Sequence, residues 1–251
     1  MSATDQPLVS LLIPAYNGEE LIDEALASAT SQTYPRVEVI VVDDGSSDRT
    51  AEVAARHDGV TVIRQQNTGP AGARNRALAI SSGEVVAFLD QDDVMLPQRL
   101  EVQVGRLLAD PSVSVTLAGE ETFVEEGASM PDWDRIVAPG LFGDAGERET
   151  LVNSISIVTW RRSFETIGLF DEAIFGGDDL DWLLRASEAG LGIERIEMPL
   201  LRRRIHRRNI SQDTETCRMA LLLCFRKRLD RRRAAGVQPT SAFTPTRPEP
   251  A

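Results

Sequence analysis

Short apolar runs alternate with longer amphipathic segments through the first half of the chain. The runs are rich in valine, isoleucine and leucine, which is typical of strands buried on both faces of a parallel sheet. The segments between them carry apolar residues at helical spacing, and Pro70 and Pro97 stand where helices are expected to begin. The pattern predicts strands at residues 9–14, 37–42, 60–64, 85–89 and 113–117, and helices at 19–30, 49–56, 71–80 and 97–109.

The pattern changes in the second half of the chain. Residues 120–150 are rich in glycine, proline and acidic side chains, and they predict a long loop, a candidate lid because loops of this length inside a domain are usually functional. Regular structure resumes at residues 155–160. It continues with helices at 162–167 and 179–189 and strands at 193–198 and 200–205.

This order of elements predicts an α/β fold, a Rossmann-like, mostly parallel sheet flanked by helices, with a C-terminal basic helical extension. We expect one domain over residues 1–211 and a basic helix over 212–236. Residues 237–251, rich in proline and threonine, are expected to be disordered. In open sheets of this kind, ligands bind beyond the carboxyl ends of the strands.

Size and composition fit a folded protein without membrane spans. The chain has 251 residues, of which 42% are hydrophobic. No apolar run approaches the roughly 18 residues of a membrane span, and the N-terminus lacks the basic and apolar blocks of a signal peptide. We therefore expect a cytoplasmic protein. Two cysteines, Cys217 and Cys224, are too few for a disulfide framework and fit small core residues.

The charge is divided unevenly along the chain. Residues 1–194 carry 13 basic and 34 acidic side chains, a net charge of −21, whereas residues 195–251 carry 14 basic and 5 acidic ones, a net charge of +9. The basic end would meet phosphates, an acidic polymer or an anionic membrane face, or else pack on the acidic domain; we favour the packed helix. We expect no nucleic acid binding, because interleaved aromatic residues are missing there.

Asp90 and Asp92 follow the apolar run that predicts the fourth strand, in the sequence FLDQDD. In an extended segment, residues two apart project to the same side, so the two carboxylates would repel unless a cation lies between them. Magnesium is commonly held by one or two carboxylates and completes its coordination with water and substrate phosphates. The motif predicts a metal–diphosphate site, with a solvated acidic turn as the alternative.

The second predicted strand also ends in acid, in the sequence VDDGSSD. Ser47 or Asp48 would cap the next helix. Capping does not explain Asp43 and Asp44. A carboxylate at a fixed strand end would accept hydrogen bonds from a nucleobase or a ribose.

A glycine-rich loop, NTGPAGARN, runs into the third predicted helix. Such loops let backbone amides approach phosphate oxygens, although Gly-Pro before a helix is also an ordinary turn. Arg74 lies in the first helical turn, where a cation opposes the helix dipole. It therefore needs an anionic partner, either a neighbouring acid or a nucleotide phosphate.

The sequence GGDDLDWLLR predicts the start of another helix. We expect Asp178 to be its N-cap and Asp181 its third residue, since both positions favour acids. Asp179 is left without a structural task. A carboxylate beside a metal site is a candidate general base for a hydroxyl nucleophile.

Taken together, PAYN, VDDGSSD, NTGPAGARN, FLDQDD, IGLFDE, GGDDLDWLLR and RIHRRNIS resemble the motifs of family 2 glycosyltransferases with the GT-A fold, in order from about residue 8 to 211. The resemblance implies a metal-dependent, inverting transfer of a sugar from a nucleotide-diphosphate donor to a hydroxyl of a glycan, a lipid-linked molecule or a small molecule. Mg²⁺ or Mn²⁺ would be the cofactor. Peripheral attachment to the inner membrane face, through the basic C-terminus, stays open.

The resemblance also implies roles for single residues. Asp43 or Asp44 and Arg74 would hold the nucleotide, Asp90 and Asp92 the ribose and the metal–diphosphate, and Asp179 the acceptor hydroxyl. The remaining candidates are Pro14, Tyr16 and Gln91 on the donor, His206 near the metal, and Trp160 and Asp178 on the acceptor side. His206 and Trp160 also fit purely structural roles, and Asp178 stands where the family commonly has Glu.

Three rival functions share parts of this pattern. A non-catalytic nucleotide-sugar sensor would need the donor pocket but no base, and Asp179 argues against it. A sugar nucleotidyltransferase would need basic residues after the first strand, where residues 15–20 have none. A Rossmann dehydrogenase fits least of the three, because Gly-x-Gly-x-x-Gly is missing after the first strand.

Overall fold

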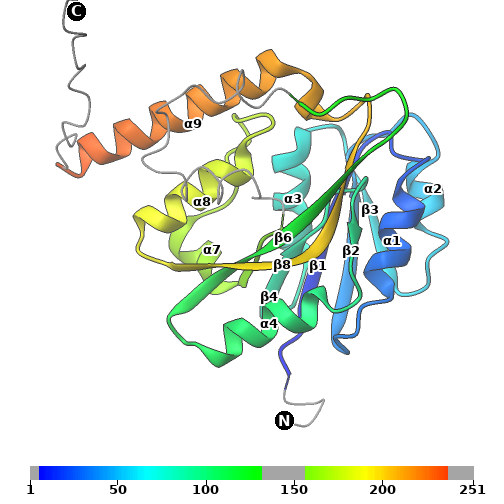
Figure 1. The fold of residues 1–251 in the computed structure, drawn as a ribbon, viewed down its shortest axis with the longest axis horizontal. Helices are drawn as coiled ribbons and strands as arrows, with labels where there is room; N and C mark the ends of the chain where they lie inside the picture. The colour runs from blue at the N-terminus through cyan, green and yellow to red at the C-terminus, as the bar shows by residue number, and fades with distance from the viewer. Residues whose placement is uncertain (1–5, 132–155, 237–251) are drawn as a thin grey trace, which may run out of the picture.

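The computed structural model describes residues 6–131 and 156–236, and within these ranges it contains one eight-stranded sheet (Figure 1). The strands lie in the order β3-β2-β1-β4-β7-β6-β8-β5. Their bounds are β1 Val9–Ala15, β2 Val37–Asp43, β3 Val60–Arg64, β4 Val85–Phe88, β5 Val94–Met95, β6 Val113–Val124, β7 Val158–Trp160 and β8 Gly192–Ile205.

Most neighbouring strands run parallel. β1 pairs in parallel with β2 and β4, β2 with β3, and β6 with β8. β7 is antiparallel to both β4 and β6, and β5 is antiparallel to β8. The predicted α/β fold with a mostly parallel sheet is confirmed, and the carboxyl ends of β1, β2 and β4 share one edge.

Helices cover both faces of the sheet because successive side chains of each strand point to opposite sides. Leu11 and Ile13 of β1 join one core, under α1, α2 and α4, whereas Leu12 joins the other, under α3, α7 and α8. Figure 1 shows α1 and α2 on the side of the sheet away from α7 and α8. The helix bounds are α1 Ile22–Thr30, α2 Thr50–Ala54, α3 Gly69–Ile80, α4 Arg99–Ala109, α7 Arg162–Ile167 and α8 Asp178–Glu188.

The last helix, α9 (Thr214–Ala234), lies against α8 and away from the sheet (Figure 1). Ala220 and Cys224 pack on Leu180 and Leu184 of α8. Four ion pairs fix the contact, and they join Lys227 to Asp171, Arg228 to Glu188, and Arg231 to both Asp181 and Glu188. For these three basic residues, packing on the acidic domain is confirmed.

Several predicted boundaries differ from the structure. β6 continues to Val124, so the expected loop does not begin at residue 120; the rest of that loop, from residue 132, and the tail 237–251 lie outside the described residues. The two expected strands at 193–198 and 200–205 form the single strand β8, with register shifts near Pro199. The two-residue strand β5 was not predicted. Within the described ranges, no helix is long and apolar enough to cross a bilayer.

Candidate functional site

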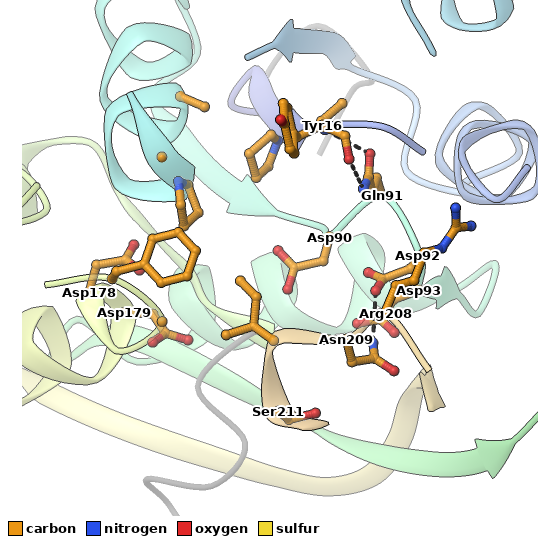
Figure 2. A pocket seen from close by; sticks show the side chains of 18 of the residues that line it. Tyr16, Asp90, Gln91, Asp92, Asp93, Asp178, Asp179, Arg208, Asn209 and Ser211 are labelled. Carbon is orange, nitrogen blue, oxygen red and sulfur yellow. Dashed lines mark hydrogen bonds between the residues drawn. The ribbon is translucent and has the colours of Figure 1, made fainter. Parts of the chain in front are cut away.

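A pocket of about 570 Å³ opens at the carboxyl edge of the sheet. Its walls come from the ends of β1 and β4, the starts of α3 and α8, the segment after β8 and the first turns of α9. The predicted site residues that line it are Pro14, Tyr16, Asp44, Arg74, Asp90, Gln91, Asp92, Asp178, Asp179 and His206. Figure 2 shows Asp90 between the pair Asp178–Asp179 and the pair Asp92–Asp93.

Asp90, Asp92 and Asp93 form a compact acidic cluster after β4. Each offers a carboxylate oxygen, and these oxygens all lie within 4.8 Å of one another. Burial raises the pKa of Asp90, and the neighbouring charge of Asp92 raises it further, against the opposing effect of Arg74. Burial also raises the pKa of Asp93 well above its usual range, with Asp92 and Asp90 adding to it. An all-oxygen set of mutually repelling carboxylates fits a hard divalent cation such as Mg²⁺ or Mn²⁺.

Two side chains hold Asp92 from the segment after β8. His206 Nε2 and Asn209 Nδ2 each lie 2.9 Å from Asp92 Oδ2. The backbone N–H of Arg208 donates to His206 Nδ1 at 3.2 Å, so Nδ1 is an acceptor and Nε2 carries the proton that it donates to Asp92. Both ring nitrogens thus have partners in this arrangement, and Nε2 lies beside the carboxylate that would hold the ion, so metal binding by His206 stays a prediction.

Asp93 is held more deeply than Asp92. The backbone N–H of Arg204 donates to Asp93 Oδ1 at 2.9 Å, and Arg204 Nε donates to the carbonyl of Asp92 at 3.0 Å. The Arg204 guanidinium also pairs with Glu24 and Glu125. The end of β8 thus fixes the backbone of the acidic turn and leaves the Asp90 and Asp92 side chains partly exposed toward the pocket.

Arg74 joins the acidic cluster to the start of α8. Its Nη1 lies 2.7 Å from Asp178 Oδ2, and its Nη2 lies 2.8 Å from Asp90 Oδ1. Because α3 begins at Gly69, Arg74 lies in its second turn and not in its first as expected, and its anionic partners are neighbouring acids. Burial raises the pKa of Asp178 to about 6, although the Arg74 charge acts in the opposite direction. Asp178 is not the N-cap that was expected, because Gly177 takes that position and the Asp178 side chain pairs with Arg74.

Asp179 lies next to Asp178 in the first turn of α8 and lines the pocket. It is partly exposed, and its Oδ1 accepts a hydrogen bond from the N–H of Leu180 at 2.7 Å. In Figure 2 its carboxylate points toward the pocket, on the far side of Asp90 from Asp92. A carboxylate in this place can receive a proton from a bound hydroxyl group.

The two acids at the end of β2 interact with other groups of the protein. Asp44 Oδ1 accepts hydrogen bonds from the Gln65 amide at 2.8 Å and the Thr68 N–H at 2.9 Å, and Oδ2 accepts from the Gly69 N–H at 2.8 Å. Asp43 is fully buried, pairs with Arg64 at 3.1 Å and does not line the pocket. Asp44 therefore holds the glycine-rich loop in place and presents only part of its surface to the pocket.

Gln91 fixes the loop that follows β1. Its side-chain amide accepts from the N–H of Tyr16 at 3.0 Å and donates to the carbonyl of the same residue at 2.9 Å (Figure 2). A side chain at position 18 would displace this amide, because a Cβ on Gly18 would lie 2.2 Å from Gln91 Oε1. The ring of Tyr16 is left half exposed at the pocket. This arrangement presents a flat aromatic surface to a ligand.

Trp160 does not line this pocket, although it was expected on the acceptor side. β7 runs antiparallel to β4, and Trp160 pairs with Val85 at the amino end of β4, away from Asp90. The ring packs on the core under α1, α2 and α4, and the Arg162 guanidinium lies 4.7 Å from its centroid. These contacts fit the structural interpretation of this tryptophan, and its contact with an acceptor stays an untested prediction.

The structure adds residues that the sequence did not single out. Asp93 and Asn209 lie inside motifs already noted, and only their contacts with the cluster reveal their roles. Phe175 and Ile210 line the pocket although 54% and 40% of their surfaces are exposed. In the sequence, Phe175 directly precedes Gly176 and Gly177, whereas Ile210 has no comparable signal.

Comparison with known proteins gives a consistent result. Residues 10–166 match the sequence profile described as "Glycosyl transferase family 2". The chain is 32% identical over 197 residues to "Glycosyltransferase AglE" of Haloferax volcanii, covering 74% of this chain and 64% of that protein. It is 39% identical over 107 residues to "UDP-Glc:alpha-D-GlcNAc-diphosphoundecaprenol beta-1,3-glucosyltransferase WfgD" of Escherichia coli, covering 41% of this chain and 42% of that protein.

Among solved structures, the fold is similar to that of S. aureus TarS 1-349 in complex with UDP-GlcNAc. The TM-score is 0.66 at 22% sequence identity, over 82% of this chain and 61% of TarS 1-349. The chain thus spans less than two thirds of the length of each of these three proteins.

Proposed function

Because the chain belongs to glycosyl transferase family 2, we propose that it transfers a sugar from a nucleotide-diphosphate donor to an acceptor hydroxyl by single displacement, with inversion at the anomeric carbon. One observation carries the proposal. The repelling carboxylates of Asp90 and Asp92 and the carboxylate of Asp179 line the same pocket from two sides. The first pair suits a metal-bound leaving group, and Asp179 suits the nucleophile.

The donor would lie over the ends of β1, β2 and β4. The half-exposed ring of Tyr16 offers a stacking surface for the base, and Gln91 keeps the backbone under that ring in place. Asp44 shapes the neighbouring loop by holding the N–H groups of Thr68 and Gly69. A UDP-linked hexose is the first donor to test, because the printed name of WfgD specifies UDP-Glc.

Asp90 and Asp92 would hold Mg²⁺ or Mn²⁺, which would neutralise the charge that develops on the leaving diphosphate. His206 and Asn209 keep the Asp92 carboxylate in one orientation through Oδ2. Arg74 does the same for Asp90 through Oδ1. Each carboxylate therefore meets the cation without first having to be ordered.

On the acceptor side, Asp179 takes the proton of the attacking hydroxyl group. At the same time the hydroxyl oxygen forms the new bond to the anomeric carbon, and the bond between that carbon and the diphosphate breaks. Arg74 fixes the turn that carries this base, because it ties the adjacent Asp178 to Asp90. The distance between base and leaving group is thereby set by one buried guanidinium. Attack from the side opposite the diphosphate gives inversion.

The test replaces Asp179 with Asn and compares it with Glu165→Gln, which removes an exposed carboxylate of α7 that does not line the pocket. Asp179→Asn should lower transfer about 10³-fold, within the range expected for a general base, and leave donor binding unchanged. Glu165→Gln should retain transfer. Full activity of Asp179→Asn, or NMR showing a product anomer with the configuration of the donor, would contradict the proposal.

A further inference from the structure

Helix α9 has one face committed to the rest of the protein. Cys217 and Leu221 line the pocket, and Ala220 and Cys224 pack against α8. A Cβ at Gly177, the residue that caps α8, would lie 3.1 Å from Ala220 Cβ, so the two helices are in close contact. The basic residues of this face are neutralised by the ion pairs with Asp171, Asp181 and Glu188 described above.

The opposite face of α9 carries a regular stripe of exposed residues. Met219, Leu222 and Leu229 are exposed by 56%, 45% and 48% of their surfaces, and Arg226 and Arg233 are exposed between and beyond them. The spacing is three, four, three and four residues, which places all five side chains on one side of the helix. We call this set the outer stripe.

The charge of the outer stripe differs from that of the body of the protein. Arg226 has no ion pair within the described residues, and Arg233 has only a 3.6 Å contact with the exposed Asp230. Residues 1–194 carry a net charge of −21. The exposed arginines are therefore available to an anionic surface, whereas the body would be repelled by it.

A second copy of the chain is a poor partner for the outer stripe. Its spacing is that of a coiled-coil seam, but a parallel pair of helices would place Arg226 against Arg226 and Arg233 against Arg233. An anionic bilayer meets both kinds of side chain, since methionine and leucine enter the boundary of the acyl chains while guanidinium groups contact lipid phosphates.

We propose that α9 docks the protein on an anionic bilayer through the outer stripe. The first turns of the same helix line the pocket, so docking brings the pocket within about one helix diameter, roughly 10 Å, of the lipid headgroups. Repulsion of the acidic body fixes the orientation, with the sheet directed away from the membrane. The surface would recruit the protein to acceptors that are themselves lipid-anchored. The docking itself does not depend on the proposed transferase chemistry.

The test measures sedimentation of the full chain with vesicles of phosphatidylcholine alone and of phosphatidylcholine with phosphatidylglycerol. We expect binding only to the vesicles that contain phosphatidylglycerol, and weaker binding as salt is raised, because charge interactions at a surface are screened. Equal binding to both kinds of vesicle, or no binding to either at low salt, would overturn the proposal.

Variants assign the binding to the outer stripe. Arg226→Glu with Arg233→Glu should lower the partition coefficient by at least about tenfold, since each arginine near an anionic surface contributes roughly fivefold. Leu222→Gln with Leu229→Gln should also weaken binding, which a purely electrostatic attachment would not show.

The matched controls lie on the other layer of helices. Arg56→Glu makes the same kind of charge change at one exposed position after α2, and Leu108→Gln makes the same kind of apolar-to-polar change at one exposed position of α4, so each is compared with the single variants Arg226→Glu and Leu222→Gln. Both controls should bind vesicles as the wild type does. If the controls lose as much binding as the outer-stripe variants, the outer stripe is not the binding surface and the proposal fails. If soluble polyglutamate competes fully while Leu222→Gln has no effect, the partner is an acidic polymer and the proposal fails as well.

Discussion

Two acidic strand ends lie at the same edge of the sheet, and the structure treats them differently. After β2, both oxygens of Asp44 accept hydrogen bonds from the segment 65–69, and Asp43 is buried beside Arg64. After β4, three carboxylate oxygens lie within 4.8 Å of one another, and burial and like charge raise the pKa of Asp90 and Asp93.

The difference separates acids that complete the fold from acids that, in the proposed function, hold a ligand. Donors surround Asp44, so its negative charge is stabilised by the protein alone. The carboxylates after β4 lie close to one another and repel, which fits the cation that we propose for them. Proximity to a pocket does not distinguish the two groups, because both Asp44 and Asp90 line it.

The largest expected effect comes from Asp92→Asn. The amide oxygen can still accept from His206 and Asn209, so the fold should be kept, and loss of one repelling charge should leave the unfolding free energy of the metal-free protein unchanged or slightly higher. Sugar transfer should fall by about 10³-fold, the equivalent of several kcal/mol of lost charge stabilisation. Kinetic assays measure the loss of transfer, and chemical denaturation measures the unfolding free energy. A variant that is both stable and fully active would show that Asp92 does not differ from Asp44 in the way proposed.

Asp44→Asn should produce the reverse pattern. An amide has one acceptor oxygen, so it cannot serve both the Thr68 and Gly69 N–H groups, and one of them would face the NH₂ group. We expect the unfolding free energy to fall by about 2 kcal/mol, as is typical when a hydrogen bond to a charged group is lost. Urea denaturation gives this value. No loss of stability would show that Asp44 is not the structural member of the pair.

The smallest effect concerns pH and the link between the two halves of the site. The pKa of Asp178 is raised to about 6, so its carboxylate is ionised above that pH, and its pairing with Arg74 weakens as the pH falls through 6. We expect transfer to fall about twofold at pH 6 and about tenfold at pH 5 relative to pH 8. Asp178→Asn, which keeps an acceptor for Arg74, should remove this pH dependence.

The raised pKa of Asp178 affects stability in the opposite direction to transfer: lower pH reduces transfer but favours folding. The native protein binds the Asp178 proton more tightly than the unfolded chain does, so this group favours folding at low pH, and its contribution to the unfolding free energy is lost as the pH rises from about 4 to 6. In Asp178→Asn, that fall in the unfolding free energy should be absent. An unchanged pH profile in both assays would assign the titration to another group.

Much of the fold could be predicted from the sequence because β1, β2 and β4 are continuous apolar runs that end in turn residues or acids. Longer-range features were missed. Pro199 suggested a break between two strands. In the structure β8 continues through Pro199, which pairs with Gly119 of β6 at a register shift. The direction of β7 has no local signal, so the sequence could not show that Trp160 lies beside the amino end of β4.

For the site, the sequence predicted which acids would meet, because the carboxyl ends of parallel strands share an edge. It could not predict which donors each acid would find. The contact between Arg74 and Asp178 joins residues 104 positions apart, and the contact between His206 and Asp92 joins residues 114 positions apart. Both depend on how α3, α8 and the end of β8 pack, which a motif does not encode.

Calorimetric titration of Mn²⁺ into the protein, with UDP present, tests the central distinction most directly. The wild type and Asp44→Asn should both bind the ion, and Asp92→Asn should show no binding heat at the same concentrations. Absence of binding to the wild type, or binding to Asp92→Asn with wild-type affinity, would contradict the proposal that the acids after β4 hold a cation.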